Sequence, residues 1–352
     1  MNLASRDFYK PGGAERLHMN SRYAALLAGA LITAASFGAP AAAQVAEVAD
    51  HPAATAFGAS FRAWLSQHEV PAASLAIMKD GHLVATLGVG GMAATAPAAI
   101  ASLSKAITGV CVAQIVDSGR LSFSVPLGSV LARTFARLGQ PADPRFKAIT
   151  IEQLLMHRAG LAREPQGGPV ARDMAGRFIN TLATPLSDDP GGAMVYSNIG
   201  YGTLGMVVEA VTGSPYERYC RDAVLKPMKV AGTIDPRLQS RASSGGWRVS
   251  AIDYARFIQV LDPVSPGLGP LARQWQAERN SASAYGLGIF ARRTPHGIVL
   301  NHSGRNALPE RGGAYVIRFA NGVTAVATFA GDPRDDGTVD LRRRLEATFA
   351  GL

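Results

Sequence analysis

The sequence of 352 residues is 47% hydrophobic and 17% charged, and its formal net charge is +9. This composition supports a substantial core and excludes an intrinsically disordered chain. The arginines are scattered rather than clustered, so the positive charge indicates a mildly basic surface and no nucleic-acid partner.

The N-terminal segment has the features of a secretory signal peptide. Arg22 precedes an apolar run over residues 23–37, and an Ala-x-Ala pattern follows it. The run is shorter than the roughly 20 apolar residues that a membrane span needs, so we expect cleavage before Gln44. We therefore predict a signal peptide over residues 1–43, with Met19 as an alternative start. The mature protein is then periplasmic or secreted and has no stable membrane span.

Local patterns predict the next elements in chain order. Apolar residues at helical spacing predict a helix over 53–69, and an Asp-Gly pair between two apolar runs predicts a tight β-hairpin over 73–90. A further helix is expected over 102–118, ending near a glycine. Thr150 and Gln153 form a capping-box pattern that opens the helix after it.

The second half of the chain changes from helices to strands. A loop rich in Pro, Gly and Asp over 163–194 precedes a helix within 196–213, and Ser250 is placed to cap another helix. After about residue 283 the apolar runs predict strands, and an Asn-Gly pair at 321–322 marks a second tight hairpin. A charged helix closes the chain.

These elements predict an α+β fold of two lobes within one domain over residues 44–352. Strands lie at both ends of this region, so the simplest packing is one antiparallel β-sheet flanked by the N- and C-terminal helices. The sheet lobe is expected over about 44–99 and 276–352, and an all-helical lobe over about 100–275. A cleft between the lobes is the natural place for a binding site.

Cysteine and histidine spacing gives no sign of a metal centre. The sequence contains no HExxH, CxxC or paired-histidine pattern, no P-loop or GxSxG motif, and no GxGxxG that opens a helix after a strand. Cys111 and Cys220 both lie in apolar helical patterns, so buried free thiols are the expectation, with a single disulfide as the alternative in an exported protein. No metal and no cofactor are predicted.

Ser102 and Lys105 lie one turn apart at the start of a predicted helix. Residues at positions i and i+3 face the same side of a helix, so the lysine amine can contact the serine hydroxyl and help to remove its proton. The helix N-terminus adds free N–H groups beside the serine. By itself, the pattern also fits a serine cap beside a surface lysine.

Tyr196 and Asn198 lie between a Gly-rich loop and a helix. A tyrosine hydroxyl near a lysine can act as a general base, and Asn198 can position Lys105 or a substrate carbonyl. Alone, Tyr196 also fits a half-buried aromatic residue whose hydroxyl is hydrogen-bonded.

His302, Ser303 and Gly304 lie at the end of a predicted strand. A glycine allows a ligand to approach the strand edge closely, and unpaired edge N–H groups can bind a peptide-like substrate or an oxyanion. The tripeptide also fits a polar strand end with a turn glycine. The three motifs in this order are much less common than any one of them.

In this order the motifs resemble the serine β-lactamase and penicillin-binding protein family, and within it class C β-lactamases, DD-peptidases and family VIII carboxylesterases. The resemblance covers nearly the whole mature chain and implies a β-lactamase/transpeptidase-like fold. It rests on the segments ASLAIMKDGHLVATLGVG, IASLSKAITG, IEQLLMHRAGL, PGGAMVYSNIGYGTLGMVVEAVTGSPYERY, GGWRVSAIDYARF, YGLGIF and NHSG.

The resemblance implies that Ser102 is the acylated nucleophile and that Lys105 and Tyr196 share the general-base work. The backbone N–H groups of Ser102 and Arg305 would form an oxyanion hole. Histidine replaces the lysine that most β-lactamases have in the third motif, so a substrate carboxylate meets less positive charge there, unless Arg305 supplies it. The substrate-binding residues implied are Asn198, His302, Ser303, Gly304 and Arg305.

The expected activity is hydrolysis of an ester or amide through an acyl-enzyme, as an esterase, a D-amino-acid peptidase or a weak β-lactamase. The alternative is a non-catalytic member that binds β-lactams or peptidoglycan. In either case the partner is a small molecule or a peptide, and the sequence does not indicate an oligomeric state.

Overall fold

The computed structural model describes residues 52–261, 283–307, 310–333 and 336–350. The signal peptide predicted over 1–43 therefore lies outside the described residues. Among the described residues, no helix combines the length and the apolar character that crossing a membrane requires.

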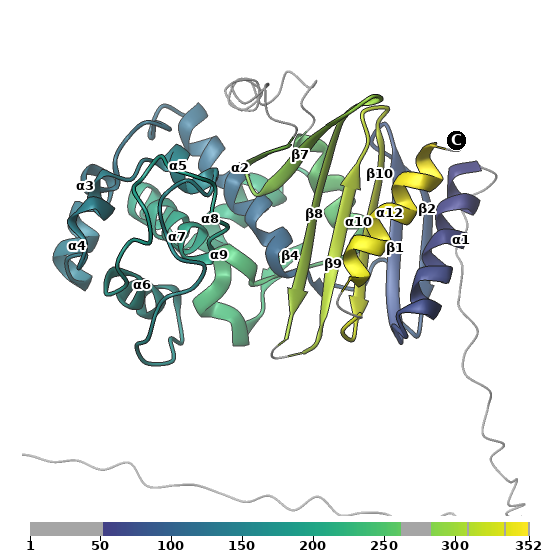
Figure 1. Ribbon diagram of the computed structural model, residues 1–352, viewed down its shortest axis with the longest axis horizontal. Helices are drawn as coiled ribbons and strands as arrows, with labels where there is room; N and C mark the ends of the chain where they lie inside the picture. The colour runs from purple at the N-terminus through teal and green to yellow at the C-terminus, as the bar shows by residue number, and fades with distance from the viewer. Residues whose placement is uncertain (1–51, 262–282, 308–309, 334–335, 351–352) are drawn as a thin grey trace, which may run out of the picture. The chain divides into compact units, whose positions relative to one another are not determined.

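A seven-stranded antiparallel sheet forms the centre of the described structure (Figure 1). The strand order is β2-β1-β10-β9-β8-β7-β6, so the first strand of the chain pairs with the last. The two tight hairpins predicted from Asp-Gly and Asn-Gly pairs join β1 to β2 and β9 to β10. The strands are β1 (Ala72–Lys79), β2 (His82–Val89), β6 (Ser283–Gly286), β7 (Ile289–Thr294), β8 (Gly297–Asn306), β9 (Gly312–Arg318) and β10 (Val323–Ala330).

Two terminal helices cover one face of this sheet, α1 (Pro52–Gln67) and α12 (Gly337–Ala350) (Figure 1). The Trp64 indole N–H joins them by donating to the Gly337 carbonyl at 2.6 Å. Side chains alternate along β1, so Leu75 packs in the core under these helices while Ala76 packs in the core on the opposite face. The strand is therefore buried on both sides, as the continuous apolar run ASLAIM requires.

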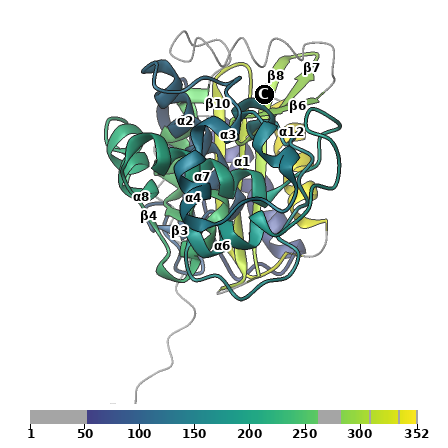
Figure 2. The same ribbon diagram turned by 90° about the vertical axis from the view of Figure 1, so that its left-hand side faces the viewer.

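The opposite face of the sheet carries the helical part of the chain, which faces the viewer in Figure 2. There α10 packs on β1 and β10, and α2 packs against α7 and α9. The helical segments are η1 (Ala101–Leu103), α2 (Ser104–Asp117), α3 (Leu127–Val130), α4 (Ala132–Leu138), η2 (Pro144–Ala148), α5 (Ile151–Leu155), α6 (Met174–Leu182), α7 (Asn198–Thr212), α8 (Tyr216–Cys220), η3 (Arg221–Leu225), η4 (Pro236–Arg241), α9 (Ala242–Gly245), α10 (Ala251–Phe257) and η5 (Ile258–Leu261).

The predicted α+β fold with an antiparallel sheet and flanking helices is confirmed, with one difference in the helical part. A second, three-stranded sheet occurs there, in the order β3-β5-β4. Its strands contain only two or three residues each, too few to produce an alternating pattern that a sequence could reveal. They are β3 (Ala98–Ala99), β4 (Gly232–Ile234) and β5 (Trp247–Val249).

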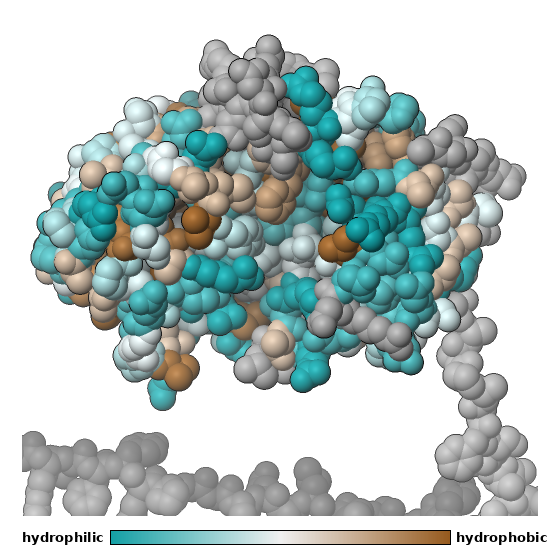
Figure 3. Space-filling view, in the orientation of Figure 1, coloured by the Kyte–Doolittle hydropathy of each residue, from teal (hydrophilic) through white to brown (hydrophobic). Residues whose placement is uncertain are grey.

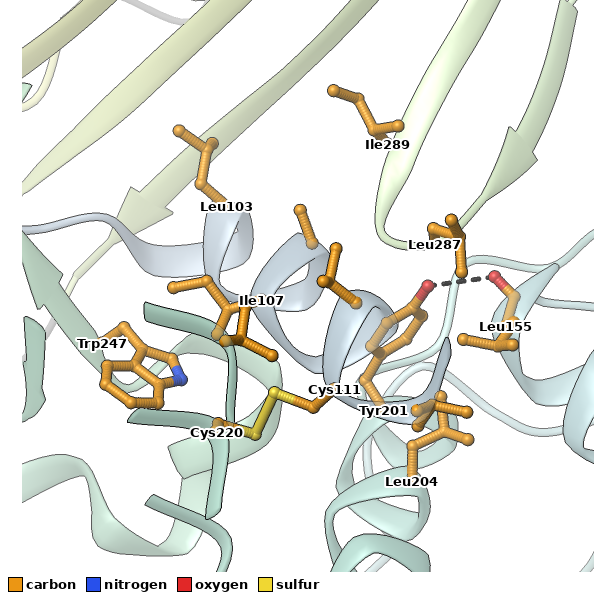
Figure 4. Packing of buried hydrophobic residues seen from close by; sticks show 14 of the residues in the cluster. Leu103, Ile107, Cys111, Leu155, Tyr201, Leu204, Cys220, Trp247, Leu287 and Ile289 are labelled. Atoms are coloured by element: carbon orange, nitrogen blue, oxygen red, sulfur yellow. Dashed lines mark hydrogen bonds between the residues drawn. A yellow bond between two sulfur atoms is a disulfide. The ribbon is translucent and has the colours of Figure 1, made fainter. Parts of the chain in front are cut away.

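Cys111 and Cys220 form a disulfide, so the expectation of buried free thiols was wrong (Figure 4). The bond joins α2 to the end of α8, and the two Cα atoms are 5.5 Å apart. Both cysteines are fully buried among apolar residues, as expected, but the two helical patterns pack against each other. This contact between residues 109 positions apart arises only from the tertiary fold.

Replacing both cysteines by serine should lower the free energy of unfolding by about 2–4 kcal/mol, because the disulfide closes a long loop and restricts the unfolded chain. Urea denaturation of the oxidised protein and of the double variant would measure this difference. Cys111→Ser and Cys220→Ser alone should each have nearly the effect of the double variant, since each breaks the same bond. Additive single effects would contradict a shared disulfide.

Candidate active site

Ser102 lies just before helix α2, beside strand β8 of the sheet. The 3₁₀ turn η1 contains it, and α2 begins two residues later at Ser104. Ala101, immediately before it, has φ of 46°, in the left-handed region that costs a non-glycine residue roughly 1–2 kcal/mol. This tight turn places the Ser102 hydroxyl 3.2 Å from the Lys105 amine.

The Lys105 amine makes three hydrogen bonds, of which two have fixed direction. Its Nζ donates to Asn198 Oδ1 at 2.7 Å and to the Ser244 carbonyl at 2.7 Å, and both of these oxygens can only accept. As an ammonium it would also donate to Ser102 Oγ, but a neutral amine has only two N–H groups, so its lone pair is then left for the Ser102 hydroxyl. In this geometry the amine can take the proton of the serine.

Glu164 fixes the orientation of the Asn198 amide. Its Oε1 accepts from Asn198 Nδ2 at 2.6 Å, which leaves the Oδ1 of that amide to face Lys105. The same carboxylate forms an ion pair with Arg177. A chain of polar contacts therefore runs from Ser102 through Lys105 and Asn198 to Glu164.

The environment of Lys105 favours its neutral form. The side chain is fully buried, and this burial holds the pKa of the amine well below its usual range. Glu164 acts in the opposite direction, while three nearby arginines lower the pKa further: Arg163, Arg177 and Arg241.

Tyr196 lies against the same lysine, with its ring centroid 4.9 Å from Lys105 Nζ. Its Oη is buried and forms no hydrogen bond within the described part of the chain. Burial raises the pKa of Tyr196 to about 12, although the neighbouring Ser102 hydroxyl lowers it in part. The phenol therefore keeps its proton at neutral pH.

His157 supports the segment that carries Tyr196. Its Nδ1 accepts from the Ser197 backbone N–H at 3.1 Å, and its ring centroid is 4.4 Å from that of Tyr196. Ser197 in turn caps α7, because its hydroxyl accepts from the Gly200 N–H at 3.1 Å. These contacts hold the loop that carries Tyr196 and fix the start of α7 at Asn198.

Tyr285 connects His302 to the rest of the site. Its hydroxyl lies 3.2 Å from His302 Nε2, and its ring centroid is 4.5 Å from that of His157. His302 Nδ1 lies 2.7 Å from the Ser303 carbonyl, which only accepts, so this nitrogen donates and Nε2 accepts from Tyr285. Burial lowers the pKa of His302 to about 3, so the ring is neutral at pH 7.

Strand β8 presents an open edge beside Ser102. It pairs with β9 from Leu300 to Asn306, but its pairing with β7 stops at Asn301. The other edge of 302–306 therefore has no strand partner among the described residues. Gly304 allows this close contact: a Cβ there would lie 2.5 Å from the Ile100 carbonyl oxygen and 3.0 Å from Ser102 N.

Ser303 and Arg305 lie on the other side of the β8 pleat from His302 and Gly304, as strand alternation requires. The Arg305 guanidinium forms an ion pair with Asp332 and donates to the Pro333 carbonyl at 3.3 Å. That side chain is therefore engaged at the end of the sheet. The Arg305 side chain therefore does not supply the positive charge that is absent at His302.

The structure brings Ser102, Lys105, Tyr196 and Asn198 together, with the edge of 302–306 beside them. Sequence reasoning missed Glu164, the Ser244 carbonyl and Tyr285. Tyr285 lies in the quoted segment YGLGIF, which was the only signal for it. No group of three or more His, Cys, Asp or Glu side chains that could hold a metal ion occurs in the described ranges.

Comparison with known proteins identifies the family. The Beta-lactamase family model matches residues 45–349, so the chain belongs to the β-lactamase family. It is 30% identical over 178 residues to penicillin-binding protein 4 of Amycolatopsis lactamdurans, covering 48% of this chain and 45% of that protein. It is 26% identical over 181 residues to protein flp of Staphylococcus aureus (strain MW2), covering 48% of this chain and 36% of that one. The chain thus spans less than half the length of these two relatives.

A solved structure shows the same fold. A D-stereospecific amidohydrolase from Streptomyces sp. superposes with a TM-score of 0.67 at 20% identity, covering 86% of this chain and all of the other. The family points to a hydrolase.

Replacing Glu164 should separate its charge from its hydrogen bond. Glu164→Gln keeps an acceptor for the Asn198 amide but removes the charge that raises the pKa of Lys105. Protonation of Lys105 should remove its ability to accept the serine proton, so kcat/KM for hydrolysis should fall at low pH. In Glu164→Gln this fall should occur at a lower pH than in the wild type. Glu164→Ala also releases the amide and should lower kcat/KM by about 10-fold or more, as for loss of a hydrogen bond to a charged group.

Both Glu164 variants remove the ion pair with Arg177, so the destabilisation that this causes is the same in both. The difference between Glu164→Gln and Glu164→Ala therefore measures the hydrogen bond to the Asn198 amide. The pH–rate profiles of the two variants and the wild type are the measurement. Identical profiles for Glu164→Gln and the wild type would exclude an electrostatic effect of Glu164 on Lys105.

Proposed function

We propose that the chain is a serine hydrolase that cleaves an ester or amide through an acyl-enzyme on Ser102. The observation that carries this proposal is the arrangement of the Lys105 amine. Two carbonyl-type acceptors occupy its N–H groups, burial favours its neutral form, and its lone pair is left for the serine hydroxyl. This is the activation that a serine nucleophile needs.

The proposed acylation proceeds as follows. Ser102 Oγ attacks the substrate carbonyl carbon while its proton moves to Lys105 Nζ. The backbone N–H groups of Ser102 and Arg305 stabilise the resulting oxyanion. The bond to the leaving group breaks as the Tyr196 phenol donates a proton to it. The Lys105 ammonium then restores the phenol proton, and a water molecule hydrolyses the acyl-enzyme by the same groups in reverse.

Tyr196 is proposed as a proton donor rather than as the first base. With a pKa of about 12, only roughly one phenol in 10⁵ is ionised at pH 7. The lysine amine, whose pKa is lowered, is the better proton acceptor at the first step. The two residues thereby divide the general acid–base work.

The substrate proposed is a small ester, a D-amino-acid amide or peptide, or a β-lactam that is hydrolysed slowly. Family membership and the D-stereospecific amidohydrolase among the neighbours support this class. Asn198 and the open edge of 302–306 would bind the amide or ester group. The alternative function is a non-catalytic β-lactam or peptidoglycan binder.

We also propose a single hydrolase domain over 44–352, exported to the periplasm or secreted. The Cys111–Cys220 disulfide supports this location, because such bonds persist in oxidising compartments.

Intact-mass spectrometry tests the proposed function. Residues 44–352 would be mixed separately with a penicillin, a short activated ester and a D-amino-acid amide. A transient adduct of the acyl mass with product release indicates a hydrolase, and the substrate that clears fastest identifies the bond type. A stable penicillin adduct without turnover of any substrate indicates the non-catalytic binder. No adduct and no product with folded protein would overturn both.

A further inference from the structure

A groove of about 710 Å³ lies beside the polar chain of the site. Glu164, which holds the Asn198 amide, forms part of its wall. The groove also reaches Ala307, directly after the last residue of β8. Its volume is in the range of pockets that hold small ligands.

Three arginines line this groove, and one of them has no acidic partner. Arg177 pairs with Glu164, and Arg237 pairs with Asp235 at 2.8 Å and with Glu310 at 2.9 Å. Arg241 is exposed and forms no ion pair with any residue in the described ranges.

A second unpaired cation stands at the Tyr196 side of the site. The Arg163 guanidinium carbon is 5.4 Å from the Tyr196 ring centroid, and Arg163 forms no ion pair with another described residue. Both Arg163 and Arg241 lie near enough to Lys105 for their charge to lower its pKa. The groove side of the site therefore carries positive charge that the protein does not neutralise.

The opposite side of the site offers no such charge. His302 is buried and neutral at pH 7, and the Arg305 side chain is occupied by Asp332. An anionic group on a substrate would therefore find its charged partner in the groove and not at the third motif.

We propose that the groove binds a carboxylate carried by the substrate and that Arg241 is the residue that pairs with it. A guanidinium matches a carboxylate with two parallel hydrogen bonds, which gives direction as well as attraction. Val170 and Leu238 provide an apolar wall for the stem between the cleaved bond and the carboxylate. This inference rests on the proposed hydrolase function and specifies its substrate class.

The experiment compares kcat/KM for esters that differ by one carboxylate. One pair, 4-nitrophenyl hexanoate and mono-4-nitrophenyl adipate, carries the difference on the acyl side. A second pair, the acetates of 4-nitrophenol and of 5-hydroxy-2-nitrobenzoate, carries it on the leaving-group side. The ratio of charged to neutral kcat/KM is the quantity measured in wild type, Arg241→Gln and Arg241→Lys. Arg62→Gln, an exposed arginine on α1, is the matched control.

The wild type should prefer the charged ester of at least one pair, and Arg241→Gln should reduce that ratio about 10-fold or more. Arg241→Lys should keep part of the preference, Arg62→Gln should keep all of it, and added salt should weaken it because the pair is exposed. The ratio cancels any change that Arg241 causes in the reactivity of Lys105. No preference in the wild type, or the same ratio in Arg241→Gln, would overturn the proposal.

A binding measurement distinguishes failure of the carboxylate site from failure of the proposed hydrolase function. If no ester is cleaved, the hydrolase function fails, and titration calorimetry of Ser102→Ala with the same esters still tests the groove. The charged ester should bind about 10-fold more tightly than the neutral one, and Ser102→Ala/Arg241→Gln should lose this difference. Equal affinities would overturn the carboxylate site on their own.

Discussion

Ser102→Ala should abolish the covalent adduct and reduce kcat by a factor on the order of 10⁶, as the loss of the nucleophile does in a comparable serine hydrolase. The alanine removes only the hydroxyl that faces the Lys105 amine at 3.2 Å, so folding should be unaffected. Intact-mass spectrometry with a penicillin and an activated ester, together with steady-state kinetics, would measure both effects.

Ser104 is the matched control for this variant. It lies in the same motif, but its hydroxyl accepts a hydrogen bond from the buried backbone N–H of Trp247 at 3.1 Å. Ser104→Ala should therefore keep the adduct and lower the free energy of unfolding by about 1–3 kcal/mol, because a buried N–H loses its partner. Labelling that persists in Ser102→Ala and disappears in Ser104→Ala would show that Ser104, and not Ser102, is the nucleophile.

Lys105→Met should lower kcat/KM by about 10²–10⁴, the usual contribution of a positioned general base. Methionine fills a similar volume without an amine. In the wild type, activity should fall as pH falls, because protonation of Lys105 removes the lone pair that takes the serine proton. Burial lowers the pKa of this lysine, so the loss should occur well below pH 10.5.

The pH–rate profile of Lys105→Met should lack this acidic limb, whereas the exposed Lys147→Met should reproduce the wild-type profile. An unchanged limb in Lys105→Met would assign the titration to another group. Its unfolding curve should also be recorded, because the variant leaves Asn198 Oδ1 and the Ser244 carbonyl without their donor.

Local chemistry made much of the fold predictable. The Asp-Gly and Asn-Gly hairpins and the capping box of Thr150 and Gln153 depend on residues a few positions apart, and the structure has all three. The disulfide and the three-stranded sheet depend on contacts between distant segments. Short strands and paired helices leave no periodic signal, so neither could be derived from the sequence.

The same distinction applies to the site. The contact between Ser102 and Lys105 follows from helical spacing, whereas the order of three motifs indicated which distant segments would meet. Glu164 acts through Asn198, which is 34 residues away. The residues around Glu164 in the sequence form no pattern that predicts this contact. The side of the sheet on which the Arg305 side chain lies could have been predicted, because strand alternation places it on the face opposite His302.

The pairing of β1 with β10 has a consequence for how the chain acquires its structure. Ser74 and Thr328 share a hydrogen bond across 254 residues, and β10 separates β1 from the rest of the sheet. During synthesis, the first hairpin therefore has no neighbouring strand until nearly the whole chain has left the ribosome. Contacts of such long range form slowly, so the central sheet should be completed late, which suits the proposed export through a translocation channel.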